Sequence, residues 1–314
     1  METVSLGGSA LNCSRLAYGC WRIVGSAESC EVTPEREAHG RKAITTAYES
    51  GYTLFDLADI YSGGESERIF GQALKSVSGM RERVLISSKC GIRKAGDPDP
   101  HSPYRYDFSA GHIIWSCEQS LKRLGIETID LYQLHRPDYL SDPEEVAQAF
   151  SRLTQAGKVR EFGVSNFHPA QLAALQKTCP TRLIVNQVEI SLAKLDCFHD
   201  TTLDQCQSEK ITPMAWSPLA GGRLGASDPI DLRDPGHARR LQLRETLDLI
   251  ARAHESSRPA IALAWLLKHP SKIVPIVGST DPQKISELTK AVDIELTRDE
   301  WYRLFEAALG HRLP

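Results

Sequence analysis

Four polar residues in the first half of the chain could together reduce a carbonyl group. Asp56, Tyr61, Lys89 and His135 each lie at, near or just after the end of a short apolar run that is typical of a buried strand. A phenol can protonate a carbonyl oxygen while a hydride reaches the carbonyl carbon. These residue types at this spacing therefore predict a carbonyl reductase in which Tyr61 is the general acid.

The other three residues are expected to support the tyrosine. A free phenol has a pKa of about 10, so it is a weak acid at neutral pH. We expect the Lys89 ammonium to lower that pKa, and Asp56 to supply the counter-charge that a buried lysine needs. We expect His135 to orient the substrate oxygen through a hydrogen bond. Each residue alone is more often structural, but their occurrence at three consecutive strand ends favours catalysis.

Strand-like and helix-like segments alternate along the chain. Apolar residues near a 3.6-residue period, or N-cap signals such as Asp142-Pro143, predict helices between most of the strands. The helices are predicted over residues 37–50, 112–124, 143–156, 169–177, 241–254, 259–268 and 281–290. The eight predicted strands are residues 16–20, 52–57, 84–88, 129–134, 159–164, 183–188, 211–216 and 273–277.

This alternation predicts parallel strands joined by helical crossovers. Two α/β folds compete for it, the (β/α)8 TIM barrel and the doubly wound sheet with a nucleotide crevice. The chain contains no G-x-G-x-x-G, no G-x-x-x-x-G-K-[ST] and no G-x-S-x-G sequence, which favours the barrel. We expect residues 1–314 to form one barrel domain. Adjacent strand ends in a barrel are neighbours, so the four polar residues can converge at one mouth.

Two segments rich in Gly, Pro and charge interrupt the alternation, at residues 91–110 and 218–240. Both are predicted to be loops. Both follow the carboxyl ends of strands, which is the active-site face of a barrel. They are therefore expected to be functional covers over the site.

Composition limits the possible partners. The 314 residues carry a net charge of -3 and include 41% hydrophobic residues, so neither nucleic acid nor a membrane is an expected partner. No apolar run has transmembrane length, and the first residues do not resemble a secretory signal. Eight scattered cysteines without a C-x-x-C pair predict reduced thiols in a cytoplasmic protein. The histidines and cysteines show no metal-ligand spacing, so no metal is expected.

On these residues the chain resembles the aldo-keto reductases. That family has an Asp-x4-Tyr pair in a segment like FDLADIYSGGESE, a Ser-Lys after the third strand and a His-x-Pro after the fourth. Asp56, Tyr61, Lys89 and His135 fall on those positions, and the resemblance covers nearly the whole chain. It implies a (β/α)8 barrel and NADP(H)-dependent reduction of aldehydes and ketones, with a small-molecule carbonyl as substrate.

The second half of the chain supports this resemblance with candidate nicotinamide ligands. Ser165 and Asn166 lie just beyond the fifth predicted strand, and Gln187 lies near the end of the sixth. Hydroxyl and amide side chains suit the nicotinamide carboxamide, and the family uses these three positions for it. Trp216 ends the seventh strand, where the family places an aromatic ring, more commonly tyrosine, that stacks on the nicotinamide.

The phosphates of the cofactor are assigned to the last two loops. After the seventh strand, backbone amides and one cation are expected at the pyrophosphate, although a solvated loop is the alternative. After the eighth strand, Lys284 falls near the family's 2′-phosphate site and Glu287 on an adenine contact. Gly278 replaces a basic residue of many members, so the strength of the preference for NADP(H) over NAD(H) stays open. The other residues expected at the cofactor are Ser217, Leu219, Gly222, Arg223, Ser279 and Thr280.

Substrate recognition is predicted at Trp21, Tyr61 and His135, with Tyr104 and Tyr106 as further candidate walls of the pocket. The chain ends in LGHRLP and lacks the long C-terminal loop of some members, which predicts an open, tolerant site. A monomer or weak oligomer is expected. Two other functions stay open: a cofactor-sensing regulatory subunit of a membrane channel with little turnover, and a barrel that binds another phosphate-bearing ligand.

Overall fold

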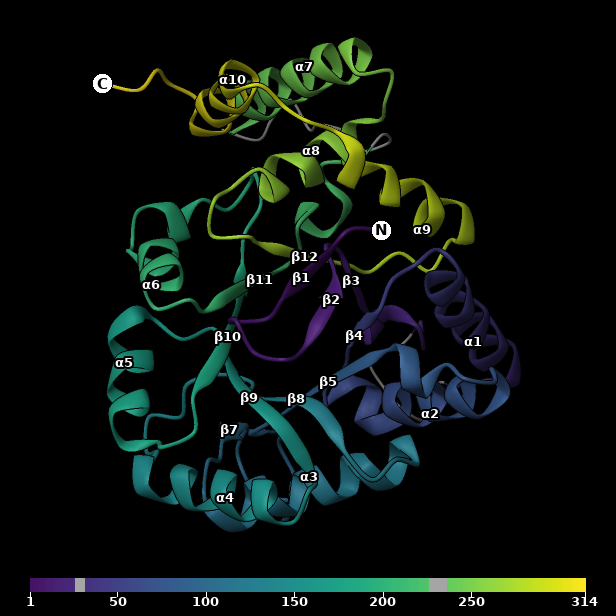
Figure 1. Cartoon of the computed structure of the whole chain (residues 1–314), viewed down its shortest axis with the longest axis vertical. Coiled ribbons are helices and arrows are strands. Elements are labelled where there is room, and N and C mark those ends of the chain that lie inside the picture. The colour runs from purple at the N-terminus through teal and green to yellow at the C-terminus, as the bar shows by residue number, and fades with distance from the viewer. Residues whose placement is uncertain (26–31, 226–235) are drawn as a thin grey trace.

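The computed structural model describes residues 1–25, 32–225 and 236–314. Eight parallel strands close a barrel in the order β3-β4-β5-β8-β9-β10-β11-β12, and β12 pairs again with β3 (Figure 1). The (β/α)8 prediction is confirmed. The strands are β3 (Ala17–Gly19), β4 (Leu54–Asp56), β5 (Leu85–Cys90), β8 (Ile129–Leu134), β9 (Val159–Ser165), β10 (Leu183–Glu189), β11 (Thr212–Trp216) and β12 (Val274–Val277).

Helices surround the barrel (Figure 1). The predicted start at Asp142 is confirmed, because its carboxylate accepts a hydrogen bond from Glu144 N and Pro143 is the first helical residue. The helices are α1 (Pro34–Glu49), α2 (Glu65–Ser76), α3 (Ala110–Leu124), α4 (Pro143–Gln155), α5 (Pro169–Thr178), α6 (Thr202–Ser208), α7 (His237–Ala253), α8 (Arg258–Leu267), α9 (Pro282–Leu288) and α10 (Arg298–Leu309).

The strand register brings the predicted catalytic residues to one rim. Asp56 at the end of β4 pairs with Ser87 of β5, and Cys90 at the end of β5 pairs with Leu134 at the end of β8. Lys89 therefore lies beside the end of β4, and His135 directly follows β8. All of them face the carboxyl end of the barrel, where the loops of a (β/α)8 enzyme form its site.

A hairpin that the sequence did not predict covers the other end of the barrel. Strands β1 (Thr3–Ser5) and β2 (Asn12–Ser14) pair in antiparallel register before β3 begins. Apolar residues of the hairpin, including Leu6 and Leu11, form one buried cluster with barrel residues such as Leu54, Leu131 and Met214. The hairpin therefore covers the amino end of the barrel, opposite the face that carries the polar residues.

The structure corrects several predicted boundaries. Residues 91–110 contain a short antiparallel hairpin, β6 (Ile92–Arg93) and β7 (Arg105–Tyr106), and are not only a loop. In the second predicted loop, α7 begins at His237, and residues 226–235 lie outside the described part. Helix α2 was not predicted; within it, a Cβ at Gly71 would lie 2.5 Å from the Leu124 carbonyl oxygen. The glycine therefore permits α2 to pack closely against the end of α3.

In the described residues, no helix is both long and apolar enough to span a lipid bilayer. Seven of the eight cysteines are buried and free of disulfide bonds. The eighth, Cys30, lies outside the described residues.

Candidate active site

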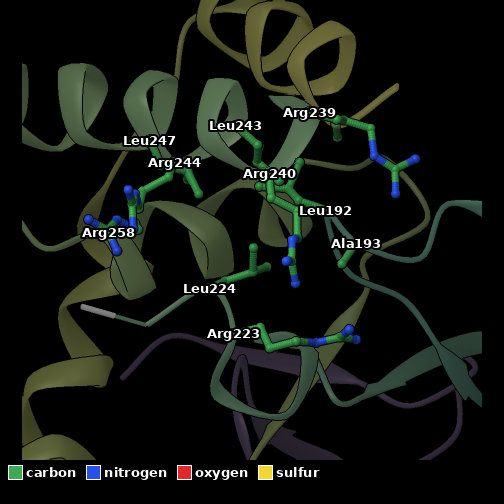
Figure 2. A pocket seen from close by; sticks show the side chains of 11 residues that line it. Leu192, Ala193, Arg223, Leu224, Arg239, Arg240, Leu243, Arg244, Leu247 and Arg258 are labelled. Atoms are coloured by element: carbon green, nitrogen blue, oxygen red, sulfur yellow. The ribbon is translucent and has the colours of Figure 1, made fainter. Parts of the chain in front are cut away.

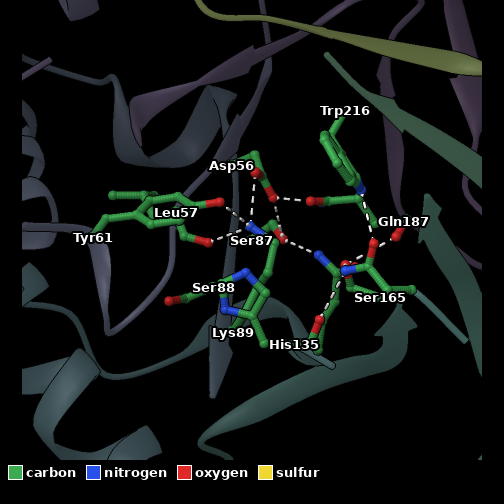
Figure 3. A network of polar contacts seen from close by, with 12 residues as sticks. Asp56, Leu57, Tyr61, Ser87, Ser88, Lys89, His135, Ser165, Gln187 and Trp216 are labelled. Carbon is green, nitrogen blue, oxygen red and sulfur yellow. Dashed lines mark hydrogen bonds and ion pairs between the residues drawn. The ribbon is translucent and has the colours of Figure 1, made fainter. Parts of the chain in front are cut away.

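Lys89 is the centre of a buried hydrogen-bond network at the mouth of the barrel (Figure 3). Its ammonium donates to Asp56 Oδ2 at 2.8 Å and to the Leu57 carbonyl oxygen at 2.7 Å. A third bond, of 3.1 Å, joins it to the hydroxyl of Tyr61, which begins the short helical turn after β4. The Lys89 side chain is 0% exposed and that of Asp56 is 4% exposed. The structure thus brings together three of the four predicted catalytic residues by direct contact.

Two residues that the sequence interpretation missed complete the surroundings of Asp56. Its Oδ1 atom accepts a hydrogen bond from Gln187 Nε2 at 2.8 Å and a long one from Ser87 Oγ at 3.5 Å. Gln133 Nε2 in turn donates to Ser87 Oγ at 2.7 Å. Polar residues inside otherwise apolar strands, as in LISSK and LYQL, are the signal that could have identified Ser87 and Gln133.

A second buried network lies behind the first, on the side of β5 that faces the helices. Side chains alternate along a strand, so Ser88 points away from Lys89. Ser88 Oγ donates to Glu67 of α2 at 2.5 Å, and Arg123 of α3 donates to the other oxygen of Glu67 at 2.7 Å. Glu67 is fully buried. These bonds fix the segment of β5 that carries Lys89 against two helices.

Asp59 joins the Tyr61 segment to α3. Its backbone N–H donates to the Lys89 carbonyl oxygen at 3.1 Å, and its Oδ2 accepts from Ser116 Oγ at 2.6 Å. The other carboxylate oxygen, Oδ1, is buried and has no partner in the described structure. Burial raises the pKa of Asp59 to about 7, although the Ser116 bond opposes the rise. No sequence pattern indicated this contact, because Asp59 and Ser116 lie on separate elements.

The direction of the pKa shift of Tyr61 differs from the expectation. Burial raises the pKa of its phenol above the usual value, and nearby Lys89 opposes that rise without reversing it. The Lys89 ammonium stays charged: burial acts to lower its pKa, but Asp56 and Tyr61 outweigh burial and the pKa is raised. Tyr61 is thus a neutral phenol held against a cation, which is the state a proton donor requires.

His135 lies edge-on to Tyr61, with ring centroids 5.9 Å apart and planes at 77°. Burial holds the pKa of His135 well below its usual value, and the charges of Lys89 and Arg136 lower it further. The imidazole is therefore neutral. Its Nδ1 is buried without a partner in the described structure. Because no acceptor faces Nδ1, we infer that the ring proton lies on Nε2, which can donate to a substrate oxygen.

The predicted nicotinamide ligands form a connected group across β9, β10 and β11. Ser165 is the last residue of β9 rather than just beyond it, and its Oγ donates to the Gln187 carbonyl oxygen at 2.9 Å. Asn166 Nδ2 donates to Ser165 Oγ at 3.0 Å and to the His135 carbonyl oxygen at 3.1 Å. Asn166 Oδ1 accepts from Trp216 Nε1 at 3.0 Å. Asn166 thus fixes both the Trp216 ring and the backbone of His135.

The predicted pyrophosphate loop after β11 adjoins a cavity of about 90 Å³ (Figure 2). Ser217 and Leu219 are half-buried, and Gly222 and Arg223 are exposed. The described lining of the cavity contains no acidic residue but several cations above an apolar floor that includes Leu224 and Leu243. Such a lining favours an anion nearby. The cations are Arg223, Arg239, Arg240, Arg244 and Arg258.

The predicted 2′-phosphate segment follows β12. Lys284 is exposed, and its ammonium lies 3.9 Å from Asp281 Oδ2, so its charge is available to solvent. Two buried tyrosines hold the backbone of this segment: Tyr18 donates to the Ser279 carbonyl oxygen at 2.8 Å and Tyr52 to that of Ile285 at 3.1 Å. The sequence did not identify these two supports. Of the remaining predicted residues, Gly278 and Glu287 are exposed and Thr280 is half-buried.

The predicted substrate residues lie around the mouth. Trp21 follows β3 and is 56% exposed. Tyr104 and Tyr106 belong to the β6–β7 hairpin, and Tyr106 also neighbours Tyr139 of the β8–α4 connection, with ring centroids 6.4 Å apart. The sequence analysis did not identify Tyr139, which is 88% exposed.

The residues present fit a nicotinamide cofactor. The Asn166 bond gives Trp216 a fixed orientation, as a stacking partner requires. Gln187 uses its amide nitrogen on Asp56, while its Oε1 makes no hydrogen bond with the described residues and can accept one from a carboxamide. In contrast, within residues 1–25, 32–225 and 236–314 no three His, Cys, Asp or Glu side chains form a group that could hold a metal ion.

Known proteins match nearly the whole chain. The model of the Aldo/keto reductase family matches residues 15–308. A protein of Novosphingobium aromaticivorans named 6-dehydroglucose reductase is 38% identical over 98% of this chain and 96% of its own length. Oxidoreductase YdhF of Escherichia coli is 40% identical, over 96% of this chain and 95% of its own. The solved structure of a glycerol dehydrogenase from Gluconobacter oxydans has a TM-score of 0.85 at 26% identity and covers 98% and 95% of the two chains.

Proposed function

This chain belongs to the aldo/keto reductase family, and we propose that it is an NADP(H)-dependent reductase of aldehydes and ketones in which Tyr61 is the general acid. The observation that carries the proposal is the neutral Tyr61 phenol held 3.1 Å from the charged Lys89 ammonium, beside the neutral His135. A reduced nicotinamide, when bound, supplies the hydride.

Each residue of the site has one role in this reaction. His135 donates a hydrogen bond from Nε2 to the carbonyl oxygen and orients it. Tyr61 transfers its proton to that oxygen as negative charge develops there. Lys89 stabilises the phenolate that remains, and Asp56, bonded to Lys89 at 2.8 Å, keeps the ammonium charged. Because burial opposes an anion here, the Lys89 charge is required for the proton to leave Tyr61.

The cationic residues near the last two loops support a phosphate-bearing cofactor. Arg223 and the cavity arginines adjoin the loop after β11, and the exposed Lys284 lies after β12. We propose that Trp216 and Gln187 hold the nicotinamide, that the loop after β11 holds the pyrophosphate, and that Lys284 recognises the 2′-phosphate of NADP(H).

For the substrate, two relatives named 6-dehydroglucose reductase suggest sugar aldehydes as the first compounds to test. We propose that the protein acts as a monomer or weak oligomer, with a small carbonyl compound as its partner. The free, buried cysteines are compatible with work in the reducing cytoplasm.

The test is NADPH oxidation with a panel of sugar aldehydes, dicarbonyls and ketones, run in parallel with NADH. Turnover that requires NADPH and is lost in Tyr61→Phe is the expected result. Tight NADPH binding without turnover on any compound would contradict the reductase proposal and favour a cofactor-sensing role.

A further inference from the structure

Arg136 is a cation at the active-site mouth that the proposed reaction does not use. It follows His135 directly at the carboxyl end of β8 and is half-buried. The hydrogen bonds and ion pairs found in the described part of the chain leave its guanidinium without a partner. A half-buried guanidinium normally acquires a carboxylate or several acceptors, since its desolvation is costly otherwise.

Two positive charges act on His135 at the mouth. Arg136, its neighbour in the chain, and Lys89 both lower the pKa of the imidazole, in addition to burial. Arg136 also acts on the phenol of Tyr104, on the neighbouring β6–β7 hairpin. The charge of Arg136 therefore acts on the residue proposed to orient the carbonyl oxygen and on an aromatic residue of the hairpin.

The nearest acidic residue in the sequence, Asp138, forms no ion pair with Arg136 in the described structure and is bonded instead to backbone N–H groups. Both carboxylate oxygens of Asp138 accept backbone hydrogen bonds at 2.9 Å, Oδ2 from Phe108 N and Oδ1 from Leu140 N. Phe108 is buried and stacks on Phe167. Asp138 therefore ties the β8–α4 connection to the end of the β6–β7 hairpin, and the two loops that surround Arg136 have fixed positions.

Those two loops form one aromatic wall. The rings of Tyr104 and Tyr106 lie 6.1 Å apart, and those of Tyr106 and Tyr139 lie 6.4 Å apart. The wall provides apolar contact for a ligand, whereas Arg136 provides a positive charge and N–H donors that can bind one. A ligand that satisfies both has a carbonyl at one end, a short organic body and an anionic group.

We propose that Arg136 selects carbonyl substrates that carry an anionic oxygen group, a carboxylate or a phosphate, a few atoms from the carbonyl. The proposal rests on the reductase function proposed above and adds the class of substrate. While His135 and Tyr61 hold the carbonyl oxygen, the guanidinium binds the anion through charge-assisted hydrogen bonds. Arg136 is then a specificity residue that takes no part in proton transfer.

The experiment compares substrates in pairs that differ by the anion. Succinic semialdehyde is paired with butanal, 4-carboxybenzaldehyde with 4-methylbenzaldehyde, and glyceraldehyde 3-phosphate with glyceraldehyde. We expect kcat/KM with NADPH to favour the anionic member by about tenfold or more, as for a hydrogen bond to a charged group. The first two pairs identify a carboxylate and the third a phosphate as the group preferred.

Arg136→Met should reduce that preference to about twofold or less, and Arg136→Lys should keep part of it. The ratio within each pair cancels any effect of Arg136 on His135, and the change of that ratio from wild type to Arg136→Met cancels the difference in intrinsic reactivity between the two aldehydes. Arg303→Met, at an exposed position of α10, is the matched control and should keep the wild-type ratio. Equal kcat/KM for both members in the wild type, or an unchanged preference in Arg136→Met, would overturn the proposal.

A binding measurement separates this proposal from the reductase proposal. Calorimetry with the alcohol 4-(hydroxymethyl)benzoate and its neutral counterpart 4-methylbenzyl alcohol requires no turnover. Tighter binding of the carboxylate by the wild type, lost in Arg136→Met, supports the role of Arg136 even if no aldehyde is reduced. Equal binding of both alcohols, together with good turnover of the neutral aldehydes, rejects the Arg136 proposal and leaves the reductase proposal intact.

Discussion

Replacing Lys89 by Met removes the charge at the centre of the site while keeping a long apolar side chain. Asp56 then loses its cation at 2.8 Å but keeps the Gln187 bond at 2.8 Å. The Leu57 carbonyl loses the donor that lies 2.7 Å away. The substitution thus leaves a buried carboxylate that is solvated by hydrogen bonds alone.

The structure supports an estimate of the stability lost. Breaking a buried ion pair by removing one partner typically costs about 3–5 kcal/mol. The hydrogen bond that Asp56 keeps from Gln187 places Lys89→Met near the lower end, at about 3 kcal/mol. Urea unfolding, with the midpoint and slope compared between variants, measures this loss. Lys122→Met, at an exposed position of α3, is the control and should change the free energy of unfolding by less than about 0.5 kcal/mol.

A double variant separates stability from activity. Lys89→Met/Asp56→Asn removes both charges, and we expect it to recover about 2 kcal/mol of the loss, because no charge is left buried without a partner. Turnover should stay about 10²–10⁴-fold below wild type in both variants, since the Tyr61 phenolate has lost its cation. Wild-type turnover in Lys89→Met, or a stability loss below about 1 kcal/mol, would refute the electrostatic argument.

Three further predictions concern other groups. Tyr61→Phe should lower kcat by about 10²–10⁴-fold and leave NADPH affinity nearly unchanged, because only the proton donor is lost. Lys284→Ala should weaken the binding of NADPH more than that of NADH, measured by fluorescence titration, since its ammonium is exposed. The folded-state pKa of Asp59, about 7, lies above its unfolded value. The contribution of protonated Asp59 to the free energy of unfolding is therefore complete below about pH 4 and is lost as the pH rises through 7. Unfolding at several pH values should show the wild type losing stability over this range, and Asp59→Asn should remove that slope.

Each of these has a result that contradicts it. An active Phe variant would remove Tyr61 as the acid. Equal losses of NADPH and NADH affinity in Lys284→Ala would mean that Lys284 does not recognise the 2′-phosphate. The same dependence of stability on pH in the wild type and in Asp59→Asn would show that another group is responsible. Ser116→Ala removes the 2.6 Å hydrogen bond to Asp59 and is compared in the same unfolding measurement.

The sequence predicted the barrel and the polar residues that meet at its mouth because both follow from short-range patterns. All eight strands were placed correctly, since a strand buried on both faces is a continuous apolar run. Lys89 and His135 could be assigned because each stands where such a run ends. A parallel barrel brings successive strand ends together, so position along the chain was sufficient to predict that these residues meet.

Contacts that depend on side-chain direction across elements were not predictable in this way. The bond of Asp59 to Ser116 joins residues 57 positions apart, and that of Gln187 to Asp56 joins residues 131 positions apart. The close approach of Gly71 in helix α2 to Leu124 is likewise not encoded by local propensity. The β1–β2 hairpin was missed because its few apolar residues are buried only by contact with the end of the barrel, which the local sequence does not reveal.

The main disagreement between sequence and structure concerns the lysine, and it changes how the site is understood. The lysine beside Tyr61 was expected to lower the pKa of the phenol, but burial outweighs the effect of the cation and raises that pKa. A phenol already ionised could not protonate a substrate, so the raised pKa preserves the donor until charge develops on the carbonyl oxygen. Lys89 then limits the cost of the buried phenolate at the moment it forms. Burial is likewise the main reason that the imidazole of His135 is neutral, and the charge of Lys89 lowers its pKa further, so burial and one lysine together set the protonation states of both groups proposed to face the substrate.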